Sequence, residues 1–304
     1  MAAVSGSVGR YGTAGTTGSS WWFPPIALGR VAVLRLLAYG FVPLDVLVTN
    51  AWVSDHGDVP AVLYRPVLLA RLAHLPTPTR TGIDLLHIAL LAAACVALAA
   101  VLARTTRLVR ASGAAVFVLY GWWMLVAMSY GKVDHDRVGY LVLLAVLPTV
   151  GAAALGEQRR SVHSGWAVRM TQTAVVATYF LAAWSKVRFG GWDWATGATL
   201  TRAVIRRGTD LAQWTLAHPS FLRAFQWGLL LLELAAPILL VVRRDRTRYL
   251  LVAVLVAFHV FTYMAISIIF LPHLVALTAF LPLERLGRHR EVAAEGGTTV
   301  PATR

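Results

Sequence analysis

Long apolar runs separated by short polar segments dominate the chain between residues 27 and 285. Several runs reach or approach the ~20 residues that a helix needs to cross a bilayer. They lack the strict alternation of a barrel strand, and backbone groups in lipid must be hydrogen-bonded internally, so we expect helices. The pattern predicts spans at about 27–50, 83–103, 111–130, 137–155, 167–186, 224–242 and 248–268.

The last apolar stretch, residues 250–283, is too long for a single crossing. Pro272 lies within it, and proline interrupts a helix. We therefore divide the stretch at Pro272 and expect a short eighth span after it. The predicted fold class is an all-α polytopic membrane protein with about eight transmembrane helices in one bundle.

The two ends of the chain differ from this pattern. Residues 1–26 begin with small and polar side chains and lack the apolar core of a secretory signal. Residues 286–304 are similarly rich in small and polar side chains. We expect both ends to be disordered tails that flank one transmembrane domain over 27–285.

Composition supports the membrane interpretation. The chain is 58% hydrophobic and 14% charged, whereas about a quarter of a typical soluble domain is charged. Its net charge of +14 does not indicate nucleic-acid binding, because the sequence has no basic helix or aromatic–basic module. The single cysteine, Cys95, excludes a disulfide framework within the chain and a cysteine-based zinc site.

The arginines between the spans predict the orientation in a cell membrane. Arginine-rich segments occur at 104–110, 156–169 and 243–248 and just after the last span. The positive-inside rule places these segments, and both termini, in the cytoplasm. The arginine excess in 187–223 is an exception to this pattern. With this topology, His135 and Lys186 lie near the extracytoplasmic face on different helices, where they can converge.

Lys186 ends the fifth predicted span and has two interpretations. The first is an anchor whose ammonium group reaches the lipid headgroups. The second is a general base, because an amine kept away from water favours its neutral form. Its aromatic neighbours, Tyr179, Trp184, Trp192 and Trp194, fit either an interfacial belt or a pocket for a flat ring.

Other polar side chains have similar alternatives. His135 belongs either to a solvated, charge-paired loop or to a substrate site in which Asp134 or Asp136 orients it. His259 is either a satisfied core histidine or part of a pocket. Glu233 at mid-span needs a cationic or hydrogen-bonding partner, for which we expect Arg35. Without a second cluster at ligand spacing, we expect no metal.

The segment YFLAAWSK, followed by WATG, resembles a motif of the HTTM (horizontally transferred transmembrane) family, which is related to vitamin K-dependent γ-glutamyl carboxylases. Lys186 takes the place of the family's catalytic lysine. Further pieces are similar in the same order, over about residues 27–285: VAVLRLLAYGFVPLD with Arg35, HDRVGYLVLLAVL with His135, LLLLELAAPILL with Glu233 in place of an aspartate, and AFHVFTYMAISIIFLPHLVALTAFLP with His259.

The resemblance implies a membrane enzyme that oxygenates a lipidic substrate. Its reactants would be a reduced naphthoquinone of the vitamin K type and molecular oxygen, with carbon dioxide as an optional third. Lys186 would be the base and His135 would stabilise or orient the oxyanion. The substrate-binding residues would be Arg35, Tyr179, Trp184, Trp192, Glu233 and His259.

The animal carboxylase has a large lumenal domain after its helices, and we expect this protein to be without a counterpart of it. We therefore expect quinol oxygenation without peptide carboxylation, or a small or partner-delivered substrate. Two rival functions stay open: a non-catalytic membrane partner, immunity or lipid-handling protein, and a small transporter. A transporter would be expected to show paired repeats and matching helix breaks, of which only Pro272 is visible.

Overall fold

The computed structural model describes residues 20–131 and 133–287, so most of both expected tails lies outside the described residues. Residues 20–26, which the sequence pattern assigned to the N-terminal tail, form a turn and enter a short strand. This strand, β1 (Ile26–Ala27), pairs antiparallel with β2 (Arg160–Ser161). The pairing ties the start of the first helix to the segment just before the longest helix.

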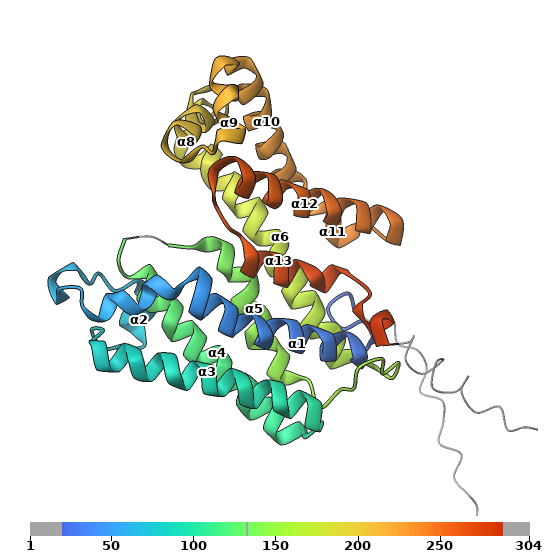
Figure 1. Cartoon of the computed structure of the whole chain (residues 1–304). Helices are drawn as coiled ribbons and strands as arrows, with labels where there is room; N and C mark the ends of the chain where they lie inside the picture. Colours follow the sequence, from blue (N-terminus) through green and yellow to red (C-terminus); the bar gives the residue numbers. More distant parts are fainter. Residues whose placement is uncertain (1–19, 132, 288–304) are drawn as a thin grey trace, which may run out of the picture.

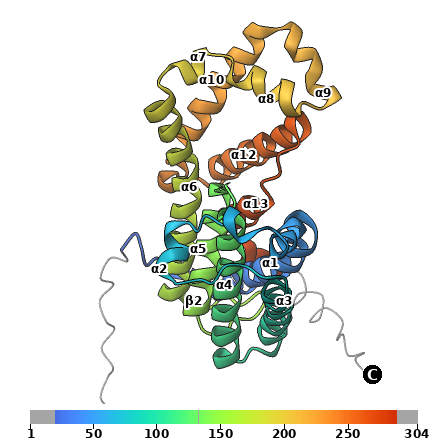
Figure 2. The same ribbon diagram turned by 90° about the vertical axis from the view of Figure 1, so that its left-hand side faces the viewer.

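The described chain is almost entirely helical. The α-helices are α1 (Leu28–Leu44), α2 (Leu68–Leu72), α3 (Arg80–Ala103), α4 (Thr106–Met128), α5 (Val138–Val146), α6 (Val162–Gly190), α7 (Asp193–Thr196), α8 (Thr199–Arg207), α9 (Asp210–Gln213), α10 (Pro219–Ala235), α11 (Ile238–Val241), α12 (Asp245–Ile266) and α13 (Leu271–Leu277). In Figures 1 and 2, α1, α3, α4, α5 and α13 form a lower bundle, and α6 extends from it to an upper group that contains α8, α9 and α10.

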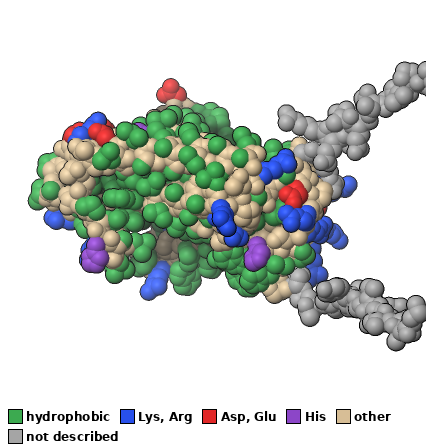
Figure 3. Space-filling view, turned by 90° about the horizontal axis from the view of Figure 1, so that it is seen from below, with side chains coloured by type: hydrophobic (Ala, Val, Ile, Leu, Met, Phe, Trp, Pro, Cys, Tyr) green, Lys and Arg blue, Asp and Glu red, His purple; other side chains and the backbone are tan. Residues whose placement is uncertain are grey.

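Five stretches of the described chain are long and apolar enough to cross a membrane: Leu28–Thr49, Arg80–Ala103, Thr106–Met128, Pro219–Val241 and Asp245–Ile266. They confirm a multi-pass, all-α membrane protein but not the expected count of eight. In place of the other three spans are short α5, the 29-residue but more polar α6, and a ten-residue helix, Leu271–Phe280. Seen from below (Figure 3), hydrophobic side chains cover most of the face, and most charged ones lie toward its two ends.

Helix α3 illustrates how the sequence separates a packed face from a lipid-facing one. Its N-terminus is capped by the Thr79 hydroxyl, which accepts a hydrogen bond from the Gly82 backbone at 3.2 Å. The buried positions recur every three or four residues: Ile83, Leu86, Leu90, Ala94, Ala97 and Ala100. Alanine at the last three keeps this face small, as in closely packed membrane helix pairs, and α1 and α4 both pack against α3. Large side chains such as Leu85 and Ile88 remain exposed on the other face, where lipid would cover them.

The span expected at 137–155 ends much earlier, and Arg35 explains how. Helix α5 stops at Val146 and a 3₁₀ turn, Leu147–Thr149, follows it. Pro148 in that turn has no backbone N–H to continue the helix. The buried guanidinium of Arg35 donates to the carbonyl oxygens of Leu147, Val150 and Gly151 beyond the helix end. Arg35 thus closes a helix end inside the bundle.

The break near Pro272 also differs from the expectation. Helix α12 ends at Ile266, and Ser267 adopts a left-handed conformation with φ of 56°. Pro272 lies in the first turn of α13. Proline is favoured there because the first turn needs no intrahelical N–H bond. Pro272 therefore begins a helix, and the segment 267–270 turns the chain.

An ion pair joins the start of α1 to the last described turn. Arg30 donates from Nε and Nη2 to the two carboxylate oxygens of Glu284 at 2.7 and 2.8 Å. Burial alone would raise the pKa of Glu284, but the hydrogen bonds and charge of Arg30 outweigh burial and hold it below the ordinary value of 4.5. A carboxylate with a lowered folded pKa stabilises the fold above its ordinary value and loses that effect as pH falls.

Glu284→Gln is expected to lower the free energy of unfolding by about 1–2 kcal/mol at pH 7, because it removes a charge-assisted, two-pronged contact. The difference from wild type should shrink as pH falls from 4.5 through the lower folded pKa. Thermal unfolding in detergent between pH 7 and acid measures both effects. Asp84→Asn, which removes an exposed partner of Arg80, is the control. A constant difference across this pH range would contradict the prediction.

Candidate functional site

The centre of the candidate site is an ion pair between α6 and α10. Both carboxylate oxygens of Glu233 accept hydrogen bonds from the Lys186 ammonium group. The Glu233 side chain is 9% exposed and that of Lys186 is 26% exposed. The Lys186 nitrogen also lies 5.0 Å from the centre of the Trp194 ring, within cation–π range. Lys186 is therefore held at a specific place between two helices and an aromatic ring.

A second polar group lies beside this pair and involves α6, α12 and α13. The Tyr179 hydroxyl and His259 Nε2 share a hydrogen bond of 2.6 Å, whose direction depends on the histidine tautomer. The ring of His273 packs edge-on against Tyr179 with centroids 4.6 Å apart. His259 Nδ1 has no hydrogen-bond partner among the described residues, whereas His273 interacts with the backbone of Asp136. His259 Nδ1 is therefore available to a bound molecule or to water.

The third component is the 3₁₀ turn His135–Arg137, which precedes α5. His135 is exposed, Asp136 is half-buried, and burial raises the pKa of the Asp136 carboxyl. Arg137 points into the bundle, where its Nη1 donates to Asp45 at 2.7 Å and to the Tyr120 hydroxyl at 2.8 Å. This buried contact fixes the turn that presents His135 and Asp136.

Asp45 collects hydrogen bonds from several elements. Asp45 is the first residue of a π-helical turn, Asp45–Thr49, that follows α1. Besides Arg137, the Tyr120 hydroxyl donates to Asp45 at 2.8 Å and the Asn50 amide at 2.9 Å, and the Thr49 hydroxyl donates to its other oxygen. Such single π-turns occur frequently at functional sites. Here the turn aims a carboxylate at the arginine that supports the His135 turn.

Two cavities meet at Lys186 and His135, which line both of them. One is a cavity of about 190 Å³ that also includes Asp136, Tyr179, Glu233, His259 and His273. The other is a groove of about 420 Å³ along α6 and the start of α5, with an apolar wall that includes Val138, Ala174, Ala177 and Leu181. A flat apolar ring in the groove would reach the amine and the imidazole at its polar end.

The structure thus brings together five of the residues selected from the sequence: His135, Lys186, Tyr179, Glu233 and His259. Arg35 lies elsewhere and binds backbone carbonyls, so its expected pairing with Glu233 is wrong; Glu233 pairs with Lys186. Trp184 and Trp192 are exposed and do not line either cavity, although Trp192 stacks on Trp227 with centroids 5.8 Å apart.

Sequence reasoning did not select His273, Asp45 or Arg137 for the site. His273 follows a helix-starting proline within an apolar stretch, so a second histidine near His259 was available as a signal. Asp45 was an equally visible signal, because a carboxylate at the end of an apolar span is costly unless it is paired. Its partner Arg137 is 92 residues away in sequence, and the helical pattern does not predict that pairing.

The donor set fits proton transfer better than metal binding. In the described part of the chain, no group of three or more histidine, cysteine, aspartate or glutamate side chains is arranged to hold a metal ion. An amine paired with a carboxylate, next to a tyrosine–histidine hydrogen bond, can accept, hold and pass a proton. The apolar groove beside them would keep water from such a reaction.

Comparison with known proteins gives one match. The family model described as "HTTM domain" matches residues 85–284, which include most of α3, all of α4 to α13 and every site residue described above except Asp45, Thr49 and Asn50. No curated protein matches the chain, and no solved structure matches it. HTTM domains are linked to vitamin K-dependent carboxylase-like membrane proteins. With about two thirds of its length matched and an all-α membrane fold that agrees, the chain belongs to the HTTM family.

Proposed function

We propose that this protein is an integral membrane enzyme that oxygenates a reduced quinone, or a similar lipidic quinol, with Lys186 as the base. The observation that carries the proposal is that Lys186, bound to a buried carboxylate, lies with His135 at the polar end of an apolar groove. The groove suits an aromatic ring, and the amine is positioned to take a proton from a ring hydroxyl.

Glu233 can accept a proton from Lys186 and so leave its amine neutral and able to act as a base. In a site of low polarity, the charged pair is costly, so transfer of a proton from Lys186 to Glu233 yields a neutral amine and a neutral acid. The neutral Lys186 nitrogen then takes the quinol proton. His135 donates to the ring oxygen on which negative charge develops. The Tyr179–His259 pair lines the adjacent cavity and faces the same polar edge of the ring as Lys186, where the groove and the cavity meet.

The reaction balances with the quinol and oxygen alone. The quinol loses two hydroxyl protons and four electrons in all, two on becoming the quinone and two as its ring double bond becomes the epoxide, and these four electrons cleave molecular oxygen. One oxygen atom forms the ring epoxide and the other leaves as water. The epoxidation could also deliver a strong base for carboxylation of a small or partner-delivered substrate, with carbon dioxide as the added group. The site near the extracytoplasmic face is part of the same proposal.

The test uses purified protein in lipid nanodiscs with 2-methyl-1,4-naphthoquinol and oxygen, with and without bicarbonate. Mass spectrometry follows epoxide formation for wild type and for Lys186→Ala. Arg188→Ala is the matched control, because it removes an exposed cation two residues further along the same helix end. Wild type and Arg188→Ala should form the epoxide, and Lys186→Ala should not.

Equal epoxide in all three proteins, as in protein-free nanodiscs, would overturn the catalytic proposal. It would favour a non-catalytic membrane partner, immunity or lipid-handling role, with the ion pair as structural support. Bicarbonate-dependent incorporation of labelled carbon into a co-purified molecule would extend the proposal to carboxylation.

A further inference from the structure

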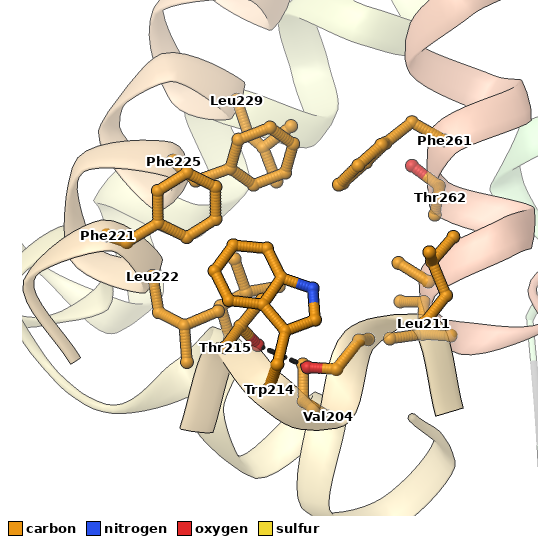
Figure 4. Close-up of a pocket in the computed structure, with 14 residues that line it drawn as sticks. Val204, Leu211, Trp214, Thr215, Phe221, Leu222, Phe225, Leu229, Phe261 and Thr262 are labelled. Carbon is orange, nitrogen blue, oxygen red and sulfur yellow. Dashed lines mark hydrogen bonds between the residues drawn. The ribbon is translucent and has the colours of Figure 1, made fainter. Parts of the chain in front are cut away.

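A separate cavity of about 180 Å³ lies between the first half of α10, the last turns of α12, and the short helices α8 and α9. Its wall is almost wholly apolar. Figure 4 shows Phe221 and Phe225 on one side, Phe261 opposite, and Trp214 between them. The Phe225 and Phe261 rings touch across the two helices with centroids 4.8 Å apart. This aromatic cavity is not part of the polar site described above.

The polar groups on the wall are already occupied. The Thr215 hydroxyl donates to the Ala212 carbonyl at 2.6 Å, and the Thr262 hydroxyl donates to the Phe258 carbonyl at 2.8 Å. The remaining polar side-chain atom of the wall is the indole nitrogen of Trp214, an exposed residue. A closed apolar cavity of about 150 Å³ stays dry and holds a benzene-sized molecule, and the size and lining of this cavity likewise suit hydrocarbon.

The aromatic cavity continues the polar site along the same two helices. On α10, Leu229 lines the aromatic cavity and Glu233, one turn later, lines the polar one. On α12, Phe258 lines the polar cavity and Thr262, one turn later, lines the aromatic one. Residues four apart are about 6 Å apart along a helix axis. The two cavities thus lie about one helical turn apart along the same two helices.

We propose that the aromatic cavity binds the hydrocarbon chain of the molecule whose head group occupies the Lys186–Glu233 site. The proposal rests on the proposed function and names the class of ligand: an amphiphile with a ring-like head and an apolar chain. Because the chain comes from lipid, which is also apolar, the cavity selects it by shape and aromatic packing and not by hydrophobicity. The position of the bound chain is therefore a sharper readout than affinity.

The experiment uses a photoreactive probe made of 2-methyl-1,4-naphthoquinone with an alkyl chain that ends in a diazirine. The chain length is about 12 Å, the axial rise from Phe225 to Glu233. Wild-type protein in nanodiscs is irradiated with the probe, and labelled residues are mapped by mass spectrometry. We expect labels on α10 and α12 around Phe225 and Phe261, and competition by the same compound without its diazirine.

Two variants test the cavity itself. Ala265→Leu places extra carbon in the aromatic cavity and should reduce labelling there about tenfold. Ala257→Leu adds the same atoms at an exposed position of α12 and should leave labelling unchanged. The competition experiment on wild type keeps the proposal testable if Ala265→Leu folds poorly.

Three outcomes would overturn the proposal. Labels on α6 beside Ala174 and Ala177 would place the chain in the groove, and an absence of labels in the aromatic cavity would show that the chain does not bind there. Equal labelling by a phospholipid with a diazirine in its acyl chain would make bilayer lipid the occupant. Labelling does not depend on turnover. Cavity labels without epoxide would uphold the chain site and reject the chemistry, whereas epoxide without cavity labels would reject the chain site alone.

Discussion

Lys186→Arg is expected to reduce the initial rate of epoxide formation at least about 100-fold, the lower end of what general-base catalysis contributes. Arginine keeps the positive charge and can still bond the Glu233 carboxylate, but its guanidinium stays protonated and cannot take a proton. The substitution therefore separates the two roles of the lysine. The rate is measured in nanodiscs with 2-methyl-1,4-naphthoquinol and oxygen, alongside thermal unfolding in the same lipid.

The unfolding temperature of Lys186→Arg should stay near that of wild type, because the buried carboxylate keeps a cationic partner. Lys186→Met is the informative companion, since it leaves Glu233 without its ammonium partner. We expect this variant to lose both activity and stability. If Lys186→Arg forms epoxide at the wild-type rate, Lys186 is an anchor and the base lies elsewhere.

Asp45→Ala is expected to lower the free energy of unfolding by about 3–5 kcal/mol, which is the usual cost of breaking a buried ion pair. The Asp45 side chain is fully buried and that of its partner Arg137 is 7% exposed. Without Asp45, the arginine keeps its charge in the bundle and loses its ion-pair hydrogen bond, with the Tyr120 hydroxyl and the nearby Asp136 charge left for support. Equilibrium unfolding in mixed detergent micelles measures the difference.

The double variant Asp45→Leu with Arg137→Met is the control, because it removes both charges and should be much closer to wild type than Asp45→Ala. A loss below about 1 kcal/mol for Asp45→Ala would show that the pair is hydrated and weak. Asp45 also holds the 3₁₀ turn His135–Arg137 in place through Arg137, and this turn presents His135 to the site. Asp45→Ala should therefore reduce epoxide formation in protein that is still folded.

The sequence pattern predicted the helices best where one apolar run matches one uninterrupted helix. The expected spans 83–103 and 248–268 correspond to α3 and α12 within a few residues. The pattern was less informative where a side chain from elsewhere ends a helix. Arg35 supplies hydrogen bonds to the carbonyls after α5, and no property of residues 137–155 alone indicates that.

The candidate site shows the same division. The resemblance to the HTTM family selected Lys186, His135, Glu233 and His259, and the structure places them around adjoining cavities. It could not tell that Glu233 pairs with Lys186 and not with Arg35, because the choice depends on how far each helix is rotated. Hydropathy reports how apolar a helix is and contains little information on which neighbour a polar side chain faces.

Amino-acid composition and the length of the apolar runs determined the class of this protein by themselves, because the cost of placing a residue in lipid is mainly a property of that residue. The ordered motifs determined the family. Only the tertiary structure decided which polar groups meet, where α5 ends, that Pro272 begins a helix, and that an aromatic cavity lies one helical turn from Glu233. Each of these depends on contacts between segments far apart in sequence, whose energies exist only once the helices are packed.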